Sequence, residues 1–284
     1  MTEFVKVGAG QMGLLMLGTI LMFVVPLVIA IMWVKRKNER FSTVLVGAAT
    51  FLLFAIVLEK PIQNVLVFPT YMGLPAHAMS EFINARPLLW AFIIGLFPGV
   101  FEETGRLVAY KTVLRNRKNK ETSISYGIGH GGFEVMFILG VTYATYVVYA
   151  VMINSGTFGT IVDQVMEQAP DQVGALITVA NQIAAFSAGD LAVGIIERIF
   201  AALFHIGASI IVFYACKNGR RIWLFLLSIL LHTLMDFIAG LTVAGVWNPP
   251  AWMLEGIVGV IGVLTFCGAL FLLYNKDVAE IMEE

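Results

Sequence analysis

Long apolar stretches, separated by short polar junctions, dominate the pattern of this chain. A transmembrane helix needs about 20 predominantly apolar residues to cross the hydrocarbon core of a bilayer. Seven stretches meet this requirement: Gln11–Val34, Ser42–Leu58, Pro87–Leu114, Ser125–Ile153, Asp190–Cys216, Ile222–Ala244 and Ala251–Tyr274. The pattern therefore predicts an all-α protein, a polytopic membrane bundle of seven transmembrane helices.

Basic residues gather in alternate junctions, which indicates the orientation of the chain. The junctions after the first, third and fifth stretches are rich in Lys and Arg, whereas the other side has only Lys6, Lys60 and Arg86. Cytoplasmic loops carry the excess of basic residues in membrane proteins. We therefore expect the N-terminus outside and the C-terminus in the cytoplasm. Two long outer connections are expected, Glu59–Arg86 and Asn154–Gly189, the second lying along the membrane surface.

The composition narrows the class of protein further. Hydrophobic residues make up 59% of the 284 positions and charged residues 13%, against about 45–50% and 25% in an ordinary soluble domain. The net charge of −1 provides no basic surface for nucleic acid, so no nucleic-acid partner is expected. Two cysteines, Cys216 and Cys267, are too few for a disulfide framework and are expected as small core residues. We expect a multi-pass protein of the cell membrane, the cytoplasmic membrane of a bacterium.

Ionisable residues lie at membrane depth, where hydropathy alone would exclude them. They comprise five acids, two arginines and three histidines: Glu102, Glu103, Glu134, Glu197, Asp236, Arg106, Arg198, His130, His205 and His232. Each such group near a helix centre costs about 2.5–3.5 kcal/mol on insertion scales. Pairing both arginines still leaves three acids, which require protonation, histidinium or a bound cation. This surplus of acids indicates a functional site.

Helical spacing puts these residues on one face of each of four successive predicted helices. Residues three or four apart are neighbours on a helix face. The four sets are Glu102 and Glu103 with Arg106; His130 with Glu134; Arg198 with His205 and Ser209; and His232 with Asp236. Each set alone also fits a structural ion pair or an interhelical hydrogen bond. Together they favour a functional cluster, because structural polar residues need not all be titratable.

The residues around these sets support a close approach of the helices. Pro98 precedes the Glu pair and is expected to kink its helix. Gly129, Gly131 and Gly132 bracket His130, and small residues allow two helices to approach closely or leave room for a substrate backbone.

Two hydrolytic mechanisms fit such a cluster. In the first, a carboxylate acts as general base on water and imidazoles donate to the developing oxyanion. In the second, Glu and His residues hold a divalent metal such as Zn, which activates the water. The candidate metal ligands are Glu103, His130, Glu134, His205 and His232. The His-Glu-x-x-His pair of the common zinc proteases is absent from the sequence, so both mechanisms stay open.

The order of the motifs along the chain resembles a known family. The motifs are Glu102-Glu103-Thr104-Gly105-Arg106, Gly129-His130-Gly131-Gly132-Phe133-Glu134, Glu197-Arg198 with His205 and Ser209, and His232 followed four residues later by Asp236. This series is similar to that of the YhfC family of intramembrane metalloproteases and, more distantly, to the PrsW proteases and the CAAX prenyl protease and bacteriocin-processing (CPBP) superfamily. Against the prenyl proteases, the arginine follows the Glu pair one residue sooner and the last motif ends in Asp.

The resemblance implies roles for the residues of the cluster. Glu102 or Glu103 would activate water, with His205 or His130 as its partner. His232 with Asp236 would stabilise the oxyanion or bind a ligand, and Arg106 would orient the carboxylates. The complete set of candidate catalytic residues is Glu102, Glu103, Arg106, His130, Glu134, Arg198, His205, His232 and Asp236.

The sequence thus predicts an intramembrane peptidase that acts on a peptide or membrane-protein substrate within or next to the lipid bilayer. We expect residues 1–284 to form a single transmembrane domain with its catalytic core at 87–244. Two alternatives remain, because buried acids and histidines also serve as proton relays. One is a proton- or ion-coupled transporter, and the other is a non-catalytic peptide-binding or immunity protein of the membrane.

Overall fold

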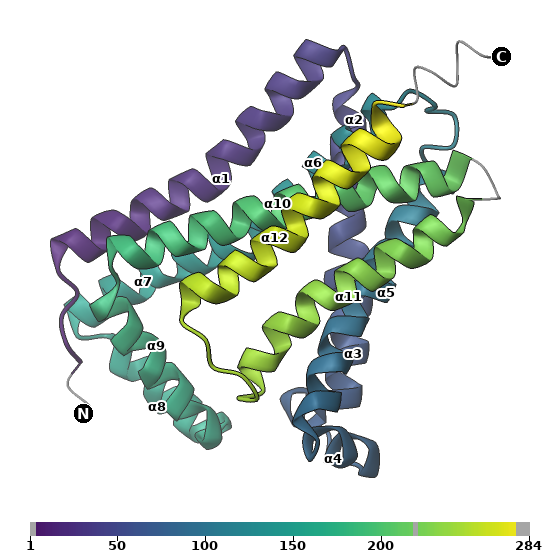
Figure 1. Cartoon of the computed structure of the whole chain (residues 1–284). Helices are drawn as coiled ribbons and strands as arrows, with labels where there is room; N and C mark the ends of the chain where they lie inside the picture. The colour runs from purple at the N-terminus through teal and green to yellow at the C-terminus, as the bar shows by residue number, and fades with distance from the viewer. Residues whose placement is uncertain (1–3, 218–220, 277–284) are drawn as a thin grey trace. The chain divides into compact units, whose positions relative to one another are not determined.

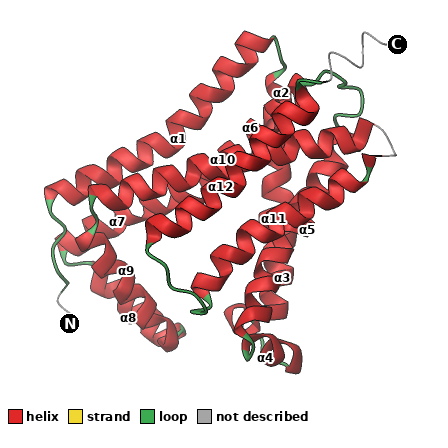
Figure 2. Cartoon of the chain, viewed as in Figure 1, coloured by secondary structure: helices red, strands yellow, loops and turns green. Residues whose placement is uncertain are grey.

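Helices make up the regular structure of this protein. A computed structural model describes residues 4–217 and 221–276, and this part of the chain contains no strand (Figures 1 and 2). Seven helical segments are long and apolar enough to cross a membrane: Ala9–Lys37, Phe41–Val67, Pro87–Lys111, Glu121–Ser155, Ala188–Lys217, Trp223–Val243 and Ala251–Tyr274. The prediction of an all-α protein with seven transmembrane helices is therefore confirmed.

Several of these segments consist of more than one element. The α-helices of the first half are α1 (Ala9–Lys37), α2 (Phe41–Phe51), α3 (Lys60–Val67), α4 (Ala78–Asn84), α5 (Pro87–Lys111) and α6 (Glu121–Val135). Those of the second half are α7 (Val141–Ser155), α8 (Phe158–Gln168), α9 (Val173–Ala185), α10 (Ala188–Lys217), α11 (Trp223–Val243) and α12 (Ala251–Ala269). Three π-helical segments, Leu52–Glu59, Met136–Gly140 and Leu270–Tyr274, and two 3₁₀ turns, Pro69–Met72 and Pro170–Gln172, complete the order.

The two long connections differ from the expectation. The second membrane segment continues to Val67, so the prediction that a loop begins at Glu59 is wrong. A π-helical segment followed by α3, whose first turn contains Pro61, extends the helix without a break, because Pro is tolerated in the first turn of an α-helix. The connection Asn154–Gly189 contains the two helices α8 and α9.

The chain divides into two compact units. Unit 1 comprises Met1–Pro26 and Val135–Ile195, and unit 2 comprises Leu27–Glu134 and Ile196–Glu284. The boundaries fall inside α1 and α10 and between Glu134 and Val135. The single-domain expectation, with its core at 87–244, stays a prediction.

Unit 1 is built on apolar packing. Its buried core includes Leu15, Ala150, Phe158 and Ile183, each no more than 1% exposed. Asn154 ties the segment before α1 to this unit through two hydrogen bonds with the backbone of Val7, both 2.8 Å long.

In unit 2, glycines let α5 and α11 pack side by side (Figure 1). A Cβ atom on Gly95 would lie 2.6 Å from the backbone nitrogen of Phe237, and one on Gly99 would lie 3.0 Å from the carbonyl oxygen of Ile229. Only glycine permits so close an approach of two backbones. This packing brings the polar face of α11 against that of α5.

Glycines of α6 let this helix pack closely against α2 and α10 in unit 2. A Cβ on Gly129 would collide with the backbone of Val44 in α2. Toward α10, a Cβ on Gly127 of α6 would lie 2.7 Å from the Cα of Ile206, and a Cβ on Gly131 would lie 3.3 Å from the Cα of Ala202. The expectation that Gly129 and Gly131 allow close helix approach is confirmed. His130, between Gly129 and Gly131, is thereby held among the other helices of the unit.

Candidate functional site

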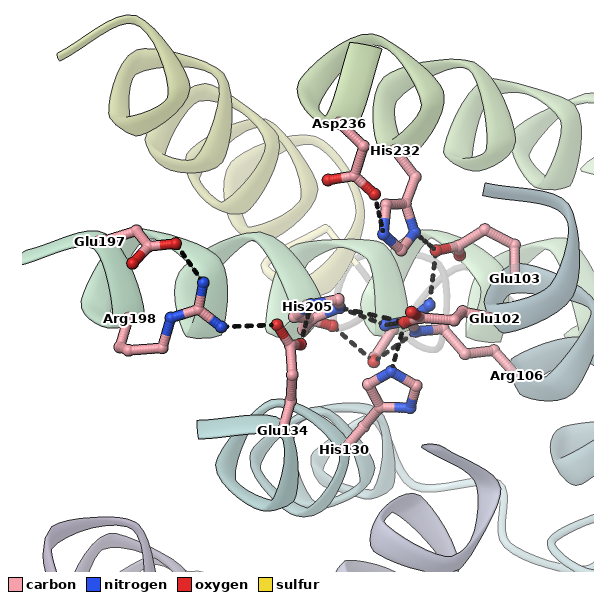
Figure 3. Close-up of polar contacts among 11 residues, drawn as sticks. Glu102, Glu103, Arg106, His130, Glu134, Glu197, Arg198, His205, His232 and Asp236 are labelled. Carbon is pink, nitrogen blue, oxygen red and sulfur yellow. Dashed lines mark hydrogen bonds and ion pairs between the residues drawn. The ribbon is translucent and has the colours of Figure 1, made fainter. Parts of the chain in front are cut away.

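Four helices of unit 2 bring the ionisable residues together (Figure 3). Helix α5 contributes Glu102, Glu103 and Arg106; α6 contributes His130 and Glu134; α10 contributes Glu197, Arg198 and His205; α11 contributes His232 and Asp236. All three histidines are no more than 2% exposed. The four polar faces predicted from helical spacing therefore belong to one connected cluster, which we call the Glu/His cluster.

Arg106 is the hub of the cluster. Its guanidinium is completely buried and donates to Oε1 of Glu103 at 2.5 Å, while Oε2 of Glu102 lies 4.0 Å away. Its Nε donates to Oγ of Ser209 at 3.3 Å. The expectation that both glutamates reach Arg106 is confirmed, with the closer contact to Glu103. A buried charge must be paired and hydrogen-bonded to be tolerated, and Arg106 satisfies both conditions.

Glu103 accepts hydrogen bonds from three sides. Besides Arg106, its Oε2 accepts from Oγ of Ser228 at 2.6 Å, and its Oε1 lies 2.8 Å from Nδ1 of His232. The other ring nitrogen of His232, Nε2, is 3.5 Å from Oδ2 of Asp236. Asp236 is more open than the rest of this branch, with 31% of its side chain exposed. This branch of the cluster therefore runs from a buried carboxylate toward the surface of the unit.

Glu102 faces the histidines of the neighbouring helices. Its Oε2 is 2.8 Å from Nε2 of His130 and 4.0 Å from Nδ1 of His205. The ring of His130 packs edge-on against Phe51, and its Nδ1 is buried with no hydrogen-bond partner in the described part of the chain. Glu102 thus has fewer close donors than Glu103, although the two are adjacent in sequence.

The contacts of His205 define its protonation pattern. Nη2 of Arg106 lies 2.6 Å from Nδ1 of His205. A guanidinium can only donate hydrogen bonds, so Nδ1 is the acceptor and the proton of the neutral ring sits on Nε2. That nitrogen is in close contact with Oε2 of Glu134. His205 is therefore held between a donor and a carboxylate.

Arg198 holds the carboxylate of Glu134 that contacts His205. Its Nη1 donates to Oε1 of Glu134 at 3.0 Å, and its Nη2 pairs with the neighbouring Glu197. Glu134 is consequently fixed on both oxygens, one by Arg198 and one by His205. His130 and Glu134, predicted to share a helix face, are bonded to different parts of the cluster.

Glu102, His130 and His205 together could hold a metal ion. One ligand atom from each lies within 4.8 Å of the others, and all three residues are buried. Two imidazoles and one carboxylate suit Zn and leave a position open for water. The contact of His205 with Glu134 resembles the outer contact of a metal-bound histidine, and the buried Nδ1 of His130 has no hydrogen-bond partner among the described residues. The donor set fits a divalent cation, although Arg106 occupies the Nδ1 lone pair of His205 in this structure.

This group of three differs from the five predicted ligands in which glutamate it contains and in its smaller size. The structure brings Glu102, not Glu103, next to the two histidines, and Glu134 and His232 lie outside the group. Helix spacing could not distinguish the two adjacent glutamates, because the rotation of α5 depends on its neighbours.

Two polar contributors were missed by the sequence analysis. Ser228 binds Glu103 and could have been found, because it lies four residues before His232 on the same face of α11. Glu59 was assigned to a loop but is a fully buried acid of unit 2. Its signal was an acid at the edge of an apolar run, which also suits the end of a helix.

Comparisons with known proteins agree with this picture. Residues 21–258 match the family described as YhfC intramembrane metalloprotease. The chain is 34% identical over 236 residues to the "Uncharacterized membrane protein YhfC" of Bacillus subtilis (strain 168). The aligned region covers 83% of this chain and 86% of that protein. No solved structure matches the chain significantly.

Proposed function

Because this chain belongs to the YhfC intramembrane metalloprotease family, we propose that it hydrolyses a peptide bond of a membrane-protein or peptide substrate, within or next to the bilayer. The observation that carries the proposal is the convergence of Glu102, His130 and His205 within 4.8 Å in a buried part of unit 2. The place of action is the cell membrane.

Glu102 is the residue that acts on water. Glu103 is bound by Arg106, Ser228 and His232, and three donors to one carboxylate make it a poor proton acceptor. Glu102 has its closest contact with His130 and is the freer of the two. Glu102 takes a proton from the attacking water as the new C–O bond forms, and passes it to the leaving amine as the C–N bond breaks.

The remaining residues position these groups. Glu103 and Arg106 hold each other at 2.5 Å and orient the end of α5 that bears Glu102. Glu134 holds His205 in one tautomer and one ring orientation, backed by Arg198. Nε2 of His232 has only a 3.5 Å approach to Asp236, so it is the ring nitrogen free to donate to the developing oxyanion.

A divalent cation, proposed here as Zn, would be held by His130, His205 and one carboxylate oxygen of Glu102, whose other oxygen would then take the proton from water. When bound it supplies Lewis-acid polarisation of water and of the scissile carbonyl. Arg106 must then release Nδ1 of His205, which it contacts at 2.6 Å. Glu103, 2.5 Å from the same guanidinium, would remain the partner of its positive charge.

The substrate approaches from the side of Asp236. Its side chain is 31% exposed, whereas those of Glu103 and His232 are no more than 2% exposed. A peptide that reaches Asp236 from this side is next to His232 and then the deeper carboxylates. The carboxylate of Asp236 suits an N–H group of an extended backbone.

The test compares new protein N-termini in membranes that contain wild-type chain or Glu102→Gln. We expect a small set of N-termini that the wild type produces and Glu102→Gln does not. Glu167→Gln, which neutralises an exposed acid of α8, is the matched control and should produce the wild-type set. Identical sets from wild type and Glu102→Gln would contradict peptide hydrolysis at this site.

A further inference from the structure

A second group of polar residues lies in unit 2 outside the Glu/His cluster. Glu59 and Gln63 are four residues apart on the continuous helix Phe41–Val67, and they are 0% and 4% exposed. Lys60, between them, has 50% of its side chain exposed. The group therefore combines two buried polar side chains with one that reaches the surface.

Lys60 makes a hydrogen bond with only one of the two side-chain polar atoms of Glu59 and of Gln63. Its Nζ lies 3.0 Å from Oε1 of Glu59 and 3.4 Å from Oε1 of Gln63. The other polar atoms, Oε2 of Glu59 and Nε2 of Gln63, are buried and find no hydrogen-bond partner in the described part of the chain. One is an acceptor and the other a donor, and burying either unpaired is unfavourable. A single water molecule can donate to the first and accept from the second.

The group lies beside α5, the helix that carries Glu102 and Glu103. The π-helical segment Leu52–Glu59 packs against α5, and a Cβ on Gly105 would lie 2.8 Å from both Thr50 Cγ2 and Phe54 Cγ. Glu59 interacts electrostatically with Glu102 and with His232. A π-helical segment turns the following residues relative to a regular α-helix, and such segments are frequent at functional sites. Here the segment ends at the buried acid itself.

We propose that Glu59, Lys60 and Gln63 form a water-binding site through which water passes from the surface of unit 2 to the Glu/His cluster. The proposal rests on the proposed function in one respect, since hydrolysis is the reason that a cluster in an apolar bundle needs water. Lys60 keeps its ammonium at the surface, as long cationic side chains do. Its contacts with Glu59 and Gln63 connect the surface to the buried polar atoms. Glu59 is the residue of this group that interacts electrostatically with Glu102.

The test measures the reaction of a cysteine with a charged, water-soluble thiol reagent, methanethiosulfonate-ethylammonium. The full-length protein, with Cys216→Ser and Cys267→Ser, is reconstituted in lipid vesicles and carries either Gln63→Cys or Val67→Cys. Val67 is the matched control, because it is 0% exposed, is apolar and lies one turn nearer the helix end. The reagent needs a thiolate, which forms only where water is present. We expect Gln63→Cys to react about tenfold faster or more than Val67→Cys.

A second substitution tests the role of Glu59. Adding Glu59→Leu to Gln63→Cys should lower the rate about tenfold, because the leucine cannot bind water, whereas Glu59→Gln should retain most of it. Monodisperse behaviour in gel filtration confirms that each variant is folded. Equal rates for Gln63→Cys and Val67→Cys, or no effect of Glu59→Leu, would overturn the water site.

The labelling needs no substrate, so its outcome is independent of proteolysis. If Gln63→Cys reacts as expected and no cleavage occurs, the water site stands and the proposed function fails. If cleavage occurs and the cysteine is unreactive, the reverse holds. Where both hold, Glu59→Leu should lower kcat and leave KM unchanged, since water and not substrate binding is affected.

Discussion

The two units of this protein bury different kinds of side chain. All buried polar and charged side chains of the described residues lie in unit 2, among them Glu59, Arg106 and the three histidines of the cluster. The buried residues of unit 1 are apolar, with Leu15 and Ile183 completely inaccessible. The buried side chains of unit 1 are held together by apolar packing, whereas burying ionisable groups is costly and marks a candidate functional site. The difference supports the placement of the proposed function in unit 2.

Contacts between a glycine and the backbone of a neighbouring helix are a second difference between the units. In unit 1, Gly18 and Gly194 face the side chain of Tyr143. In unit 2, Gly95 and Gly129 face the backbone of a neighbouring helix. A side chain can move to accommodate a new methyl group, but a backbone in a helix cannot. Unit 2 therefore depends on glycines to place its polar side chains within hydrogen-bond distance of one another.

The largest expected effect is the loss of metal from unit 2. His205→Ala removes a proposed ligand, and we expect Zn affinity to fall by more than about 100-fold, beyond the loss typical of residues that only support a ligand. Leu15→Ala, in the core of unit 1, should lower thermal stability and leave the metal content at the wild-type value. Metal analysis of the purified proteins measures both. Equal metal content in wild type and His205→Ala would refute the assignment of His205 as a ligand.

Glu134→Gln should have the next largest effect. It keeps the size of the side chain but weakens the contact that fixes His205 and the pair with Arg198. We expect a fall of about 10–100-fold in metal affinity or in kcat, the range for residues that orient a ligand. Glu134→Asp should recover part of it in the same measurements. A value within twofold of wild type would show that His205 is positioned without Glu134.

The glycine comparison predicts opposite changes in stability. Gly129→Ala should destabilise the protein by about 1–3 kcal/mol, because its methyl group meets the backbone of Val44. Gly174→Ala, in α9 of unit 1, meets nothing within 4 Å and should stabilise by about 0.5–1 kcal/mol through helix propensity. Thermal unfolding in detergent measures both. Similar shifts for the two variants would remove the distinction between the glycines of the two units.

The smallest expected effect concerns the end of unit 1. Asn154→Ala removes two hydrogen bonds with Val7, each worth about 0.5–1.5 kcal/mol. We expect faster amide exchange around Val7, measured by hydrogen–deuterium exchange, and unchanged metal content. A metal content different from that of the wild type would mean that this end of unit 1 influences the Glu/His cluster.

The sequence predicted the helices of this protein well because a single physical requirement governs them. Every backbone group in lipid must be hydrogen-bonded internally, so a run of about 20 apolar residues has one solution, a helix. The predicted end of the second helix at Glu59 was wrong. An acid next to Lys60 and Pro61 is equally suited to the end of a membrane helix and to its continuation, so the sequence could not decide between them. The topology with the N-terminus outside stays a prediction.

The ionisable residues of the Glu/His cluster were also predicted from the sequence, whereas Ser228 was not. Ten ionisable residues in apolar helices must face one another, and their spacing of three or four residues identifies the face of each helix. Their partners were decided only by the tertiary structure. Glu102 meets His130 and Glu103 meets His232, because the glycine contacts of α5 and α6 set the rotation and depth of both helices. Side-chain periodicity specifies a direction around a helix axis, and only the packing of backbones decides which neighbour lies in that direction.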